Sequence, residues 1–215
     1  MATNLLSKLS IATVSTAAIS LSILSANPAQ AATITFDNVT NSQLDLIGNQ
    51  YEGFNWTNFG VIKDGFYNNS GYNNGIVSGE YTGFNAWGQT ATVSSNTLFD
   101  FNGAFLAAAW NNGLNIQVDG FRDGLNLFSK TVRVDTDAAT WFDFNFLDID
   151  RVSFTSFGGT DAGLDAGGNQ LVIDNFTFND QPTSQAVPEP GTIAALGLIG
   201  LGGLLTNKKL NASDN

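Results

Sequence analysis

Leu114-Asn115-Ile116-Gln117-Val118-Asp119 is the stretch of this 215-residue chain that indicates its fold most directly. Apolar and polar side chains alternate in it with a period of two, which is typical of a β-strand with one buried face and one wetted face. The run before it, AFLAAAW at residues 104–110, is apolar throughout and predicts a fully buried central strand. The two segments together predict a sheet that packs on a hydrophobic core.

The same signals recur on both sides of this stretch. Alternation returns at Phe142, Phe144 and Phe146, and turn-rich Asn-Ser-Gly and Asn-Asn-Gly sequences separate shorter apolar runs. Further strands are expected at residues 33–36, 54–57, 60–63, 75–78, 84–87, 91–94, 98–101, 127–134, 152–154 and 171–178. No convincing helix pattern lies between residues 32 and 180, so this segment is predicted to be one all-β domain, an antiparallel β-sandwich or barrel.

Composition excludes several classes of function. The chain has no cysteine and no histidine, which removes disulfides, Ser-His-Asp and Cys-His catalysis and nearly every zinc-hydrolase scheme. Residues 32–180 contain 17 acidic and five basic side chains, a balance of −12. Nucleic acid is therefore not an expected partner. The same charge disfavours polyanionic sugars and makes divalent cations plausible partners.

The N-terminus has the pattern of a secretory signal peptide. A single positive charge, Lys8, precedes the apolar, serine-containing segment at residues 9–24, and Ala29-Gln30-Ala31 supplies small residues for cleavage after Ala31. We expect a signal helix in residues 1–31 that is removed on export; the alternative is an uncleaved membrane anchor.

The C-terminus combines three signals in a fixed order. A polar linker at residues 181–187 leads to Pro188-Glu189-Pro190, whose prolines enforce extended backbone. Residues 192–205 are uncharged and predict a short transmembrane helix, below the ~20 residues of a full span. Lys208 and Lys209 follow as a cytoplasmic membrane stop, and residues 211–215 end the chain. The alternative is a buried core helix or a disordered apolar tail.

This tail, at residues 188–210, resembles the PEP-CTERM sorting signal of exported Gram-negative bacterial proteins. The resemblance implies recognition of Pro188, Glu189 and Pro190 by an exosortase-type sorting enzyme, in a membrane that holds the chain by its C-terminal helix. It implies export across the inner membrane, transient anchoring, and a final place at the cell surface or outside the cell. The basic cluster departs from the family in using lysine where arginine is usual.

A second resemblance covers most of residues 33–179. Segments such as Phe99-Asp100-Phe101 and Val172-Ile173-Asp174-Asn175-Phe176 are similar to the jelly-roll domain common in PEP-CTERM proteins. That domain is similar in turn to galactose-binding and carbohydrate-binding-module folds, so the resemblance implies a jelly-roll β-sandwich. In such modules the terminal strands commonly pair and hold a structural Ca²⁺.

Calcium ligands are candidates on that basis. Asp37, with Asn38, follows the first predicted strand, and Asp174, with Asn175, lies in the last. The alternative is that Asp174 bonds a neighbouring loop while Asp37 and Asn38 cap a turn. A weaker oxygen cluster is Asp161 with Asp165.

Several aromatic residues are candidates for sugar binding. Trp56, Tyr72 and Trp87 lie in the glycine- and asparagine-rich half of the domain, where flat rings neighbour amide side chains. The alternative is that these rings are core residues. Only two glutamates, Glu52 and Glu80, are available in the domain for glycoside hydrolysis. We expect a non-enzymatic surface or matrix protein, structural or adhesive, that binds exopolysaccharide; the alternative is a glycan-active enzyme.

Overall fold

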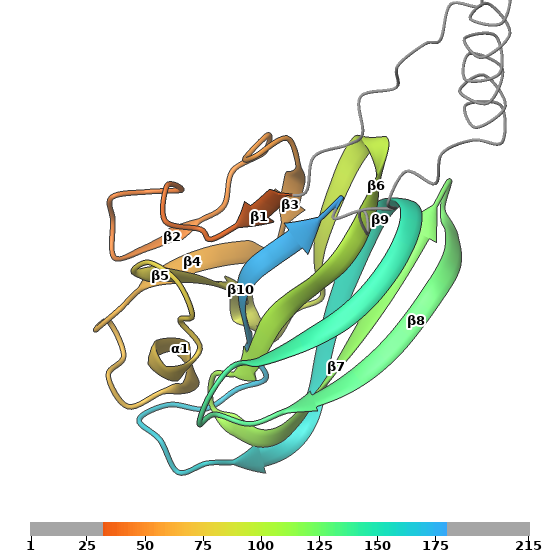
Figure 1. The fold of residues 1–215 in the computed structure, drawn as a ribbon. Helices are drawn as coiled ribbons and strands as arrows, with labels where there is room; N and C mark the ends of the chain where they lie inside the picture. The colour runs from red at the N-terminus through yellow and green to blue at the C-terminus, as the bar shows by residue number, and fades with distance from the viewer. Residues whose placement is uncertain (1–31, 180–215) are drawn as a thin grey trace, which may run out of the picture.

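The computed structural model describes residues 32–179 (Figure 1). The predicted signal peptide, the linker from residue 181 and the Pro-Glu-Pro tail, with the two helices expected there, lie outside the described residues. Within residues 32–179 no helix has the length and apolar character to cross a membrane.

The described chain is built from strands, and every pairing between them is antiparallel. The elements are β1 (Ala32–Ile34), β2 (Leu44–Leu46), β3 (Asn55–Thr57), β4 (Phe59–Lys63), α1 (Gly71–Asn74), β5 (Tyr81–Asn85), a 3₁₀ turn (Ala86–Gly88), β6 (Ala91–Ala108), β7 (Asn111–Arg122), β8 (Leu125–Val134), β9 (Thr140–Asp161) and β10 (Leu171–Phe178). The predicted all-β, antiparallel architecture is confirmed.

Some predicted boundaries were wrong. The strands expected at residues 91–94, 98–101 and 104–110 merge into the single long strand β6, which ends at Ala108, and those at 142–146 and 152–154 merge into β9. The strand expected at residues 75–78 is absent, because this segment follows α1 as a loop. The short edge strand β2 was not predicted.

The strand order is β2-β4-β5-β10-β6-β9-β7-β8, with β1 paired to β10 and β3 paired to β6. β6 and β9 are long enough to belong to two layers. Residues 91–94 of β6 pair with 151–154 of β9, and residues 99–106 pair with 140–149. The register shifts between Ser94 and Phe99, which bends both strands. The sheet therefore folds over itself, an arrangement consistent with the predicted β-sandwich (Figure 1).

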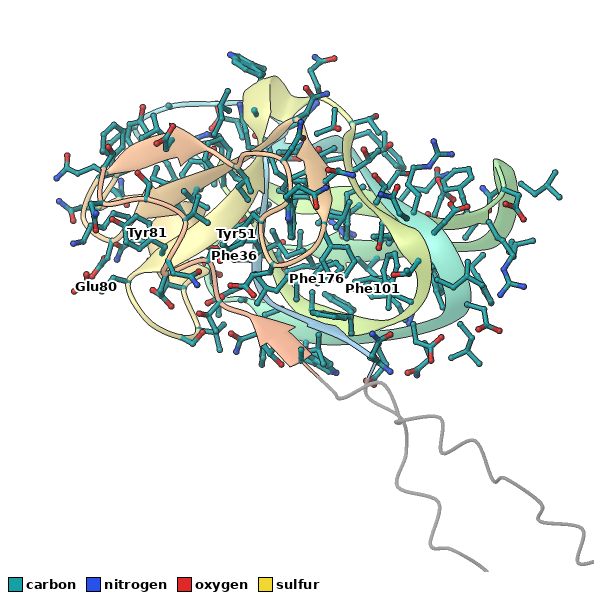
Figure 2. The ribbon with its side chains drawn as sticks, turned by 90° about the horizontal axis from the view of Figure 1, so that it is seen from above. Phe36, Tyr51, Glu80, Tyr81, Phe101 and Phe176 are labelled. Carbon is teal, nitrogen blue, oxygen red and sulfur yellow. The ribbon has the colours of Figure 1, made fainter. Side chains whose placement is uncertain are left out.

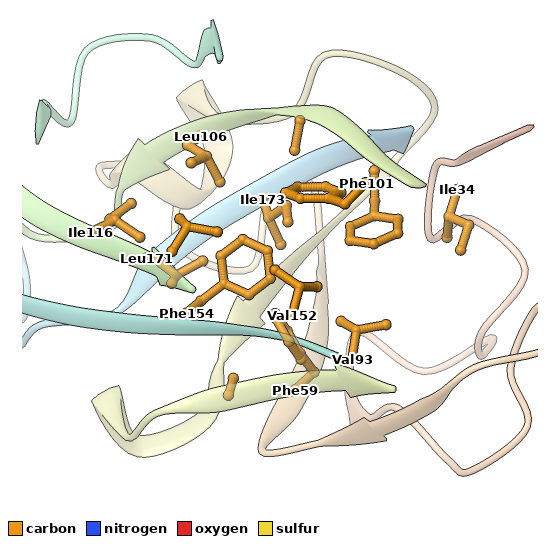
Figure 3. Packing of buried hydrophobic residues seen from close by; sticks show 14 of the residues in the cluster. Ile34, Phe59, Val93, Phe101, Leu106, Ile116, Val152, Phe154, Leu171 and Ile173 are labelled. Atoms are coloured by element: carbon orange, nitrogen blue, oxygen red, sulfur yellow. The ribbon is translucent and has the colours of Figure 1, made fainter. Parts of the chain in front are cut away.

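The core lies between the two halves of this folded sheet. Figure 3 shows Val93 and Phe101, from opposite halves of β6, pointing into the same apolar interior. Phe101 stacks on Phe176 of β10 with ring centroids 4.7 Å apart, and Phe154 of β9 meets Phe101 edge-on at 5.9 Å. Burying each phenylalanine contributes about 1.5–3 kcal/mol, and the ring pairs add to this. The phenylalanines that alternate in the sequence thus hold the layers together.

A second, smaller apolar cluster covers the outer side of the same sheet. Its buried members come from β4, α1, β6, the β6–β7 connection and β10: Ile62, Tyr72, Ala107, Ala109, Trp110 and Val172. α1 approaches the sheet so closely that a Cβ on Gly71 would lie 1.7 Å from the carbonyl oxygen of Ala108. Glycine at position 71 is therefore what allows this contact.

Candidate functional site

Trp87 is the most exposed large apolar side chain among the described residues, with 69% of its surface open. It lies in the 3₁₀ turn that follows β5, with φ 55° and ψ 17°. A bulky residue in this left-handed region is uncommon and strained by about 1–3 kcal/mol. The rest of the structure must therefore hold the turn in place.

Asn85, which is fully buried, supplies much of that support. Its amide nitrogen donates to the carbonyl of Gln89, at 2.8 Å across the turn, and to the hydroxyl of Ser156 at 3.0 Å. Its amide oxygen accepts the Leu171 N–H at 2.7 Å. The turn that carries Trp87 is thus tied to both β9 and β10, and the indole is presented on a rigid base.

A pocket of about 400 Å³ lies beside the Trp87 ring. Its lining residues come from β2, the end of β5, the turn and the residue before β10: Leu44, Asp45, Leu46, Phe84, Ala86, Trp87 and Gln170. Leu44 and Leu46, at the sheet edge, are about half exposed. The side-chain oxygen of Gln170 is buried and has no hydrogen-bond partner among the described residues. The pocket therefore combines apolar walls with the side chain of Gln170, whose amide oxygen lacks a partner in the described range.

This arrangement suits a ligand that is apolar on one face and polar at its edge. Most small-ligand pockets have about this volume, mainly apolar walls and a few placed polar groups. A pyranose ring fits that description, because its C–H face can lie on an indole while its hydroxyls bond amides and carboxylates. Trp87, Gln170 and Asp45 line the pocket, and each Asp45 oxygen already accepts one hydrogen bond, from the Thr40 hydroxyl at 3.0 Å and from the Leu46 N–H at 2.8 Å.

Trp56 and Tyr72, the other aromatic residues predicted to bind glycan, lie in the two apolar clusters. Trp56 is 3% exposed, packs edge-on against Phe59 at 5.2 Å and donates its indole N–H to the Tyr51 carbonyl. Tyr72 is 6% exposed, and burial raises the pKa of its hydroxyl. Neither ring has a face free for a sugar, so the core interpretation holds for both, and the glycan-binding prediction rests on Trp87.

Asp37 and Asp174 are brought to one short loop, residues 77–81. Asp174 is fully buried and accepts the N–H groups of Val77 at 2.7 Å and Ser78 at 2.9 Å. Asp37 accepts the N–H of Glu80 at 2.6 Å. Burial raises the pKa of Asp174 to about 6, and the charge of Asp37 adds to the rise. The two carboxylates clamp the loop from both ends.

This donor set does not fit the implied calcium ion. Asp174 also accepts its neighbour's amide, Asn175 N–H, at 2.7 Å, so both of its oxygens already bond to backbone N–H groups. The side-chain oxygen of Asn38 accepts a hydrogen bond from the Tyr51 hydroxyl at 2.5 Å, and the Asp161 carboxylate accepts one from the Gly163 N–H. Within residues 32–179 no group of three or more His, Cys, Asp or Glu gathers where it could hold a metal. The terminal strands do pair, as the resemblance implied, through residues 32–34 of β1 and 176–178 of β10.

Glu52 and Glu80, the glutamates considered for catalysis, take part in separate contacts. Glu52 accepts the side-chain amide of Asn38 at 3.0 Å. Glu80 forms an ion pair with Lys63 at 2.9 Å and lies at the periphery of the molecule, far from the core phenylalanines (Figure 2). The catalytic alternative stays a hypothesis.

Sequence reasoning found Trp87 but missed the rest of this pocket. The period-two pattern of Leu44-Asp45-Leu46 is a signal that could have indicated β2. Gln170 carries no such signal, because only the pairing of β10 with β5 brings it near the Trp87 turn.

No family model and no curated protein matches this chain significantly. Among solved structures it is similar to the module TmCBM61 in complex with β-1,4-galactotriose, at 12% identity and a TM-score of 0.31, over 67% of this chain and 92% of the module. It is also similar to the agarase AgWH50C, at 12% identity and a TM-score of 0.33, over 81% of this chain and 33% of the agarase. Since these TM-scores are low, function has to be argued from the site itself.

Proposed function

We propose that residues 32–179 form a non-catalytic jelly-roll module that binds a neutral polysaccharide at the Trp87 pocket. The Trp87 side chain carries this proposal: its indole is exposed, and its strained backbone is held by a well-supported turn. Trp87 lines one pocket together with the half-exposed Leu44 and Leu46, and a contiguous exposed apolar patch of this kind marks a binding site, whereas a single exposed ring does not. Gln170 lines the same pocket, and its buried amide oxygen has no hydrogen-bond partner among the described residues.

The charge of the domain supports an uncharged ligand. The balance of −12 over residues 32–180 repels polyanionic chains, and Asp45 lines the pocket itself. A neutral sugar is not repelled and can donate a hydroxyl hydrogen to the carboxylate.

The setting is proposed to be the outside of the cell. The signal-peptide pattern before Ala32 and the Pro-Glu-Pro tail support export and sorting through an exosortase-type enzyme. The protein would then act at the cell surface or in the extracellular matrix, where it would attach to or organise exopolysaccharide.

Affinity electrophoresis of the purified full chain tests the proposal. Gels that contain a neutral polysaccharide, such as a galactan, a glucan or a mannan, should retard the wild-type protein, and Trp87→Ala should lose most of the retardation. Trp87→Phe keeps a smaller ring and should retain part of it.

Leu127→Ala is the matched control, because Leu127 is also an exposed apolar residue (47%) and does not line the Trp87 pocket. Equal retardation of wild type and Trp87→Ala on every retarding polysaccharide contradicts the proposal. Release of reducing ends from a bound polysaccharide would favour the enzymatic alternative.

A further inference from the structure

A second pocket, of about 410 Å³, opens between the bulge of β6 and the β7–β8 turn. Polar side chains line most of it: Ser94, Ser95, Asn96, Leu98, Asp123, Gly124, Asp150 and Arg151. It shares no lining residue with the Trp87 pocket. The bulge arises because Ser94 of β6 pairs with Arg151 of β9, and the next β6 residue that is paired, Phe99, lies opposite Ile149. The β6 residues between Ser94 and Phe99 therefore have no partners in the ladder.

Arg151 is the unusual residue of this pocket. Its guanidinium lies over the ring of Phe121, 4.2 Å from the centroid, because the two residues are paired on β9 and β7. The guanidinium makes no hydrogen bond or ion pair with any residue in the described range, and its Nε is buried without a partner. Leaving a charged group unpaired costs free energy. Since the Arg151 side chain is only partly buried, a ligand acceptor that reaches the rest of the guanidinium would recover part of that cost.

Two carboxylates line the same pocket without pairing to Arg151. Asp150 accepts the backbone N–H of Asp123 at 2.6 Å through one oxygen. The Asp123 side chain has no hydrogen bond or ion pair with a described residue. Asp123 and Gly124 have φ of 52° and 79°, so they form a two-residue hairpin turn that fixes the Asp123 position. The pocket thus presents unused donors and unused acceptors on a rigid frame.

We infer that the Arg151 pocket is a second carbohydrate site, which binds an uncharged sugar residue through its hydroxyl groups. Each hydroxyl both donates and accepts, so one sugar can serve the guanidinium on one side and the two carboxylates on the other. The lining carries one positive and two negative charges, which disfavours an acidic sugar, while Arg151 disfavours a simple cation. The volume lies within the usual range for a small ligand, about 300–1,000 Å³.

The consequence is a bivalent chain. One protein molecule can then hold two polysaccharide chains, one in the Trp87 pocket and one in the Arg151 pocket, and so cross-link them. Linked sites also raise avidity without new contacts. This inference rests on the proposed function only for the class of ligand. Since the pockets share no residue, either can fail alone.

Arginine side-chain NMR tests the site directly. The full chain, labelled with ¹⁵N and kept in a detergent without a sugar headgroup, is titrated with the methyl glycosides of galactose, glucose and mannose. The Nε–H signal of Arg151, assigned by its loss in Arg151→Lys, should shift with at least one of them. Sodium galacturonate should shift it less than methyl galactoside does.

Two variants give the site a functional readout. The first, Arg151→Lys, removes the guanidinium and with it the NMR signal. The second, Asp123→Asn, should weaken the titration of the Arg151 signal roughly tenfold or more, because a charge-assisted hydrogen bond to the sugar is lost. Asn tolerates the left-handed backbone at position 123, so the second variant keeps the turn. Both should keep Trp87-dependent retardation in gels but lose the ability of wild type to precipitate a soluble polysaccharide.

The outcomes separate the two proposals. Persistence of the Arg151 shift in Trp87→Ala supports an independent second site, even if the Trp87 pocket binds nothing. An Arg151 signal that responds to none of the three glycosides overturns the inference and leaves the Trp87 proposal intact. A stronger response to galacturonate than to the neutral glycosides also overturns it.

Discussion

Replacing Asp174 by asparagine should change how the stability of this domain depends on pH. Asp174 is fully buried in β10, and its carboxylate accepts three backbone N–H groups from the 77–81 loop and its own neighbour. Removal from water dominates over these bonds and raises its pKa from 3.8 to about 6. Asparagine keeps the shape of the side chain but has no proton to lose.

The direction of the pH effect on the unfolding free energy follows from how tightly the folded and unfolded states bind the Asp174 proton. The folded state holds the Asp174 proton more tightly than the unfolded state does, so this group stabilises the fold fully below pH 3.8. That contribution is lost as the pH rises through about 6. With about 1.4 kcal/mol for each pKa unit, the loss between pH 4 and pH 7 amounts to roughly 2–3 kcal/mol.

The measurement is urea unfolding, followed by tryptophan fluorescence, at several pH values. The unfolding free energy of wild type minus that of Asp174→Asn should fall by roughly 2–3 kcal/mol from pH 4 to pH 7. Asp165→Asn is the control for the substitution itself, because Asp165 is exposed in the 162–170 loop. A difference that rises with pH for Asp174→Asn would refute the reasoning, since the three N–H groups would then outweigh desolvation.

Three further predictions concern the core, a close contact and the chain ends. Trp56→Ala should destabilise the domain by about 3–5 kcal/mol in urea unfolding, whereas Trp87→Ala should stay within about 0.5 kcal/mol; similar losses would contradict the burial of one and the exposure of the other. Gly71→Ala should cost about 2 kcal/mol or more and lower the calorimetric Tm, because the new methyl group meets the Ala108 carbonyl; an unchanged Tm would argue against the contact. The intact mass of the exported protein should match a chain that starts after Ala31 and lacks the two C-terminal lysines, and lysines retained outside the cell envelope would contradict the sorting proposal.

The candidate site shows where sequence reasoning stops. Trp56 and Trp87 are alike in the sequence, since both lie in a segment rich in glycine, asparagine and aromatic residues. Their fates differ because Trp56 is on β3, which faces the core, and Trp87 is on a turn after β5. Periodicity does not distinguish these positions, since a turn has no repeating face.

The amino-acid sequence by itself determined the all-β class, the buried central strand and the absence of histidine and thiol chemistry. These follow from period two and composition, which act locally along the chain. Only the tertiary structure decided which aromatic ring is open and which polar groups share a pocket. Arg151 shares a pocket with Asp123 because β9 pairs with β7 beside the β7–β8 turn, and Gln170 shares one with Trp87 because β10 pairs with β5. Such proximity depends on the register between strands distant in sequence, and no local pattern contains it.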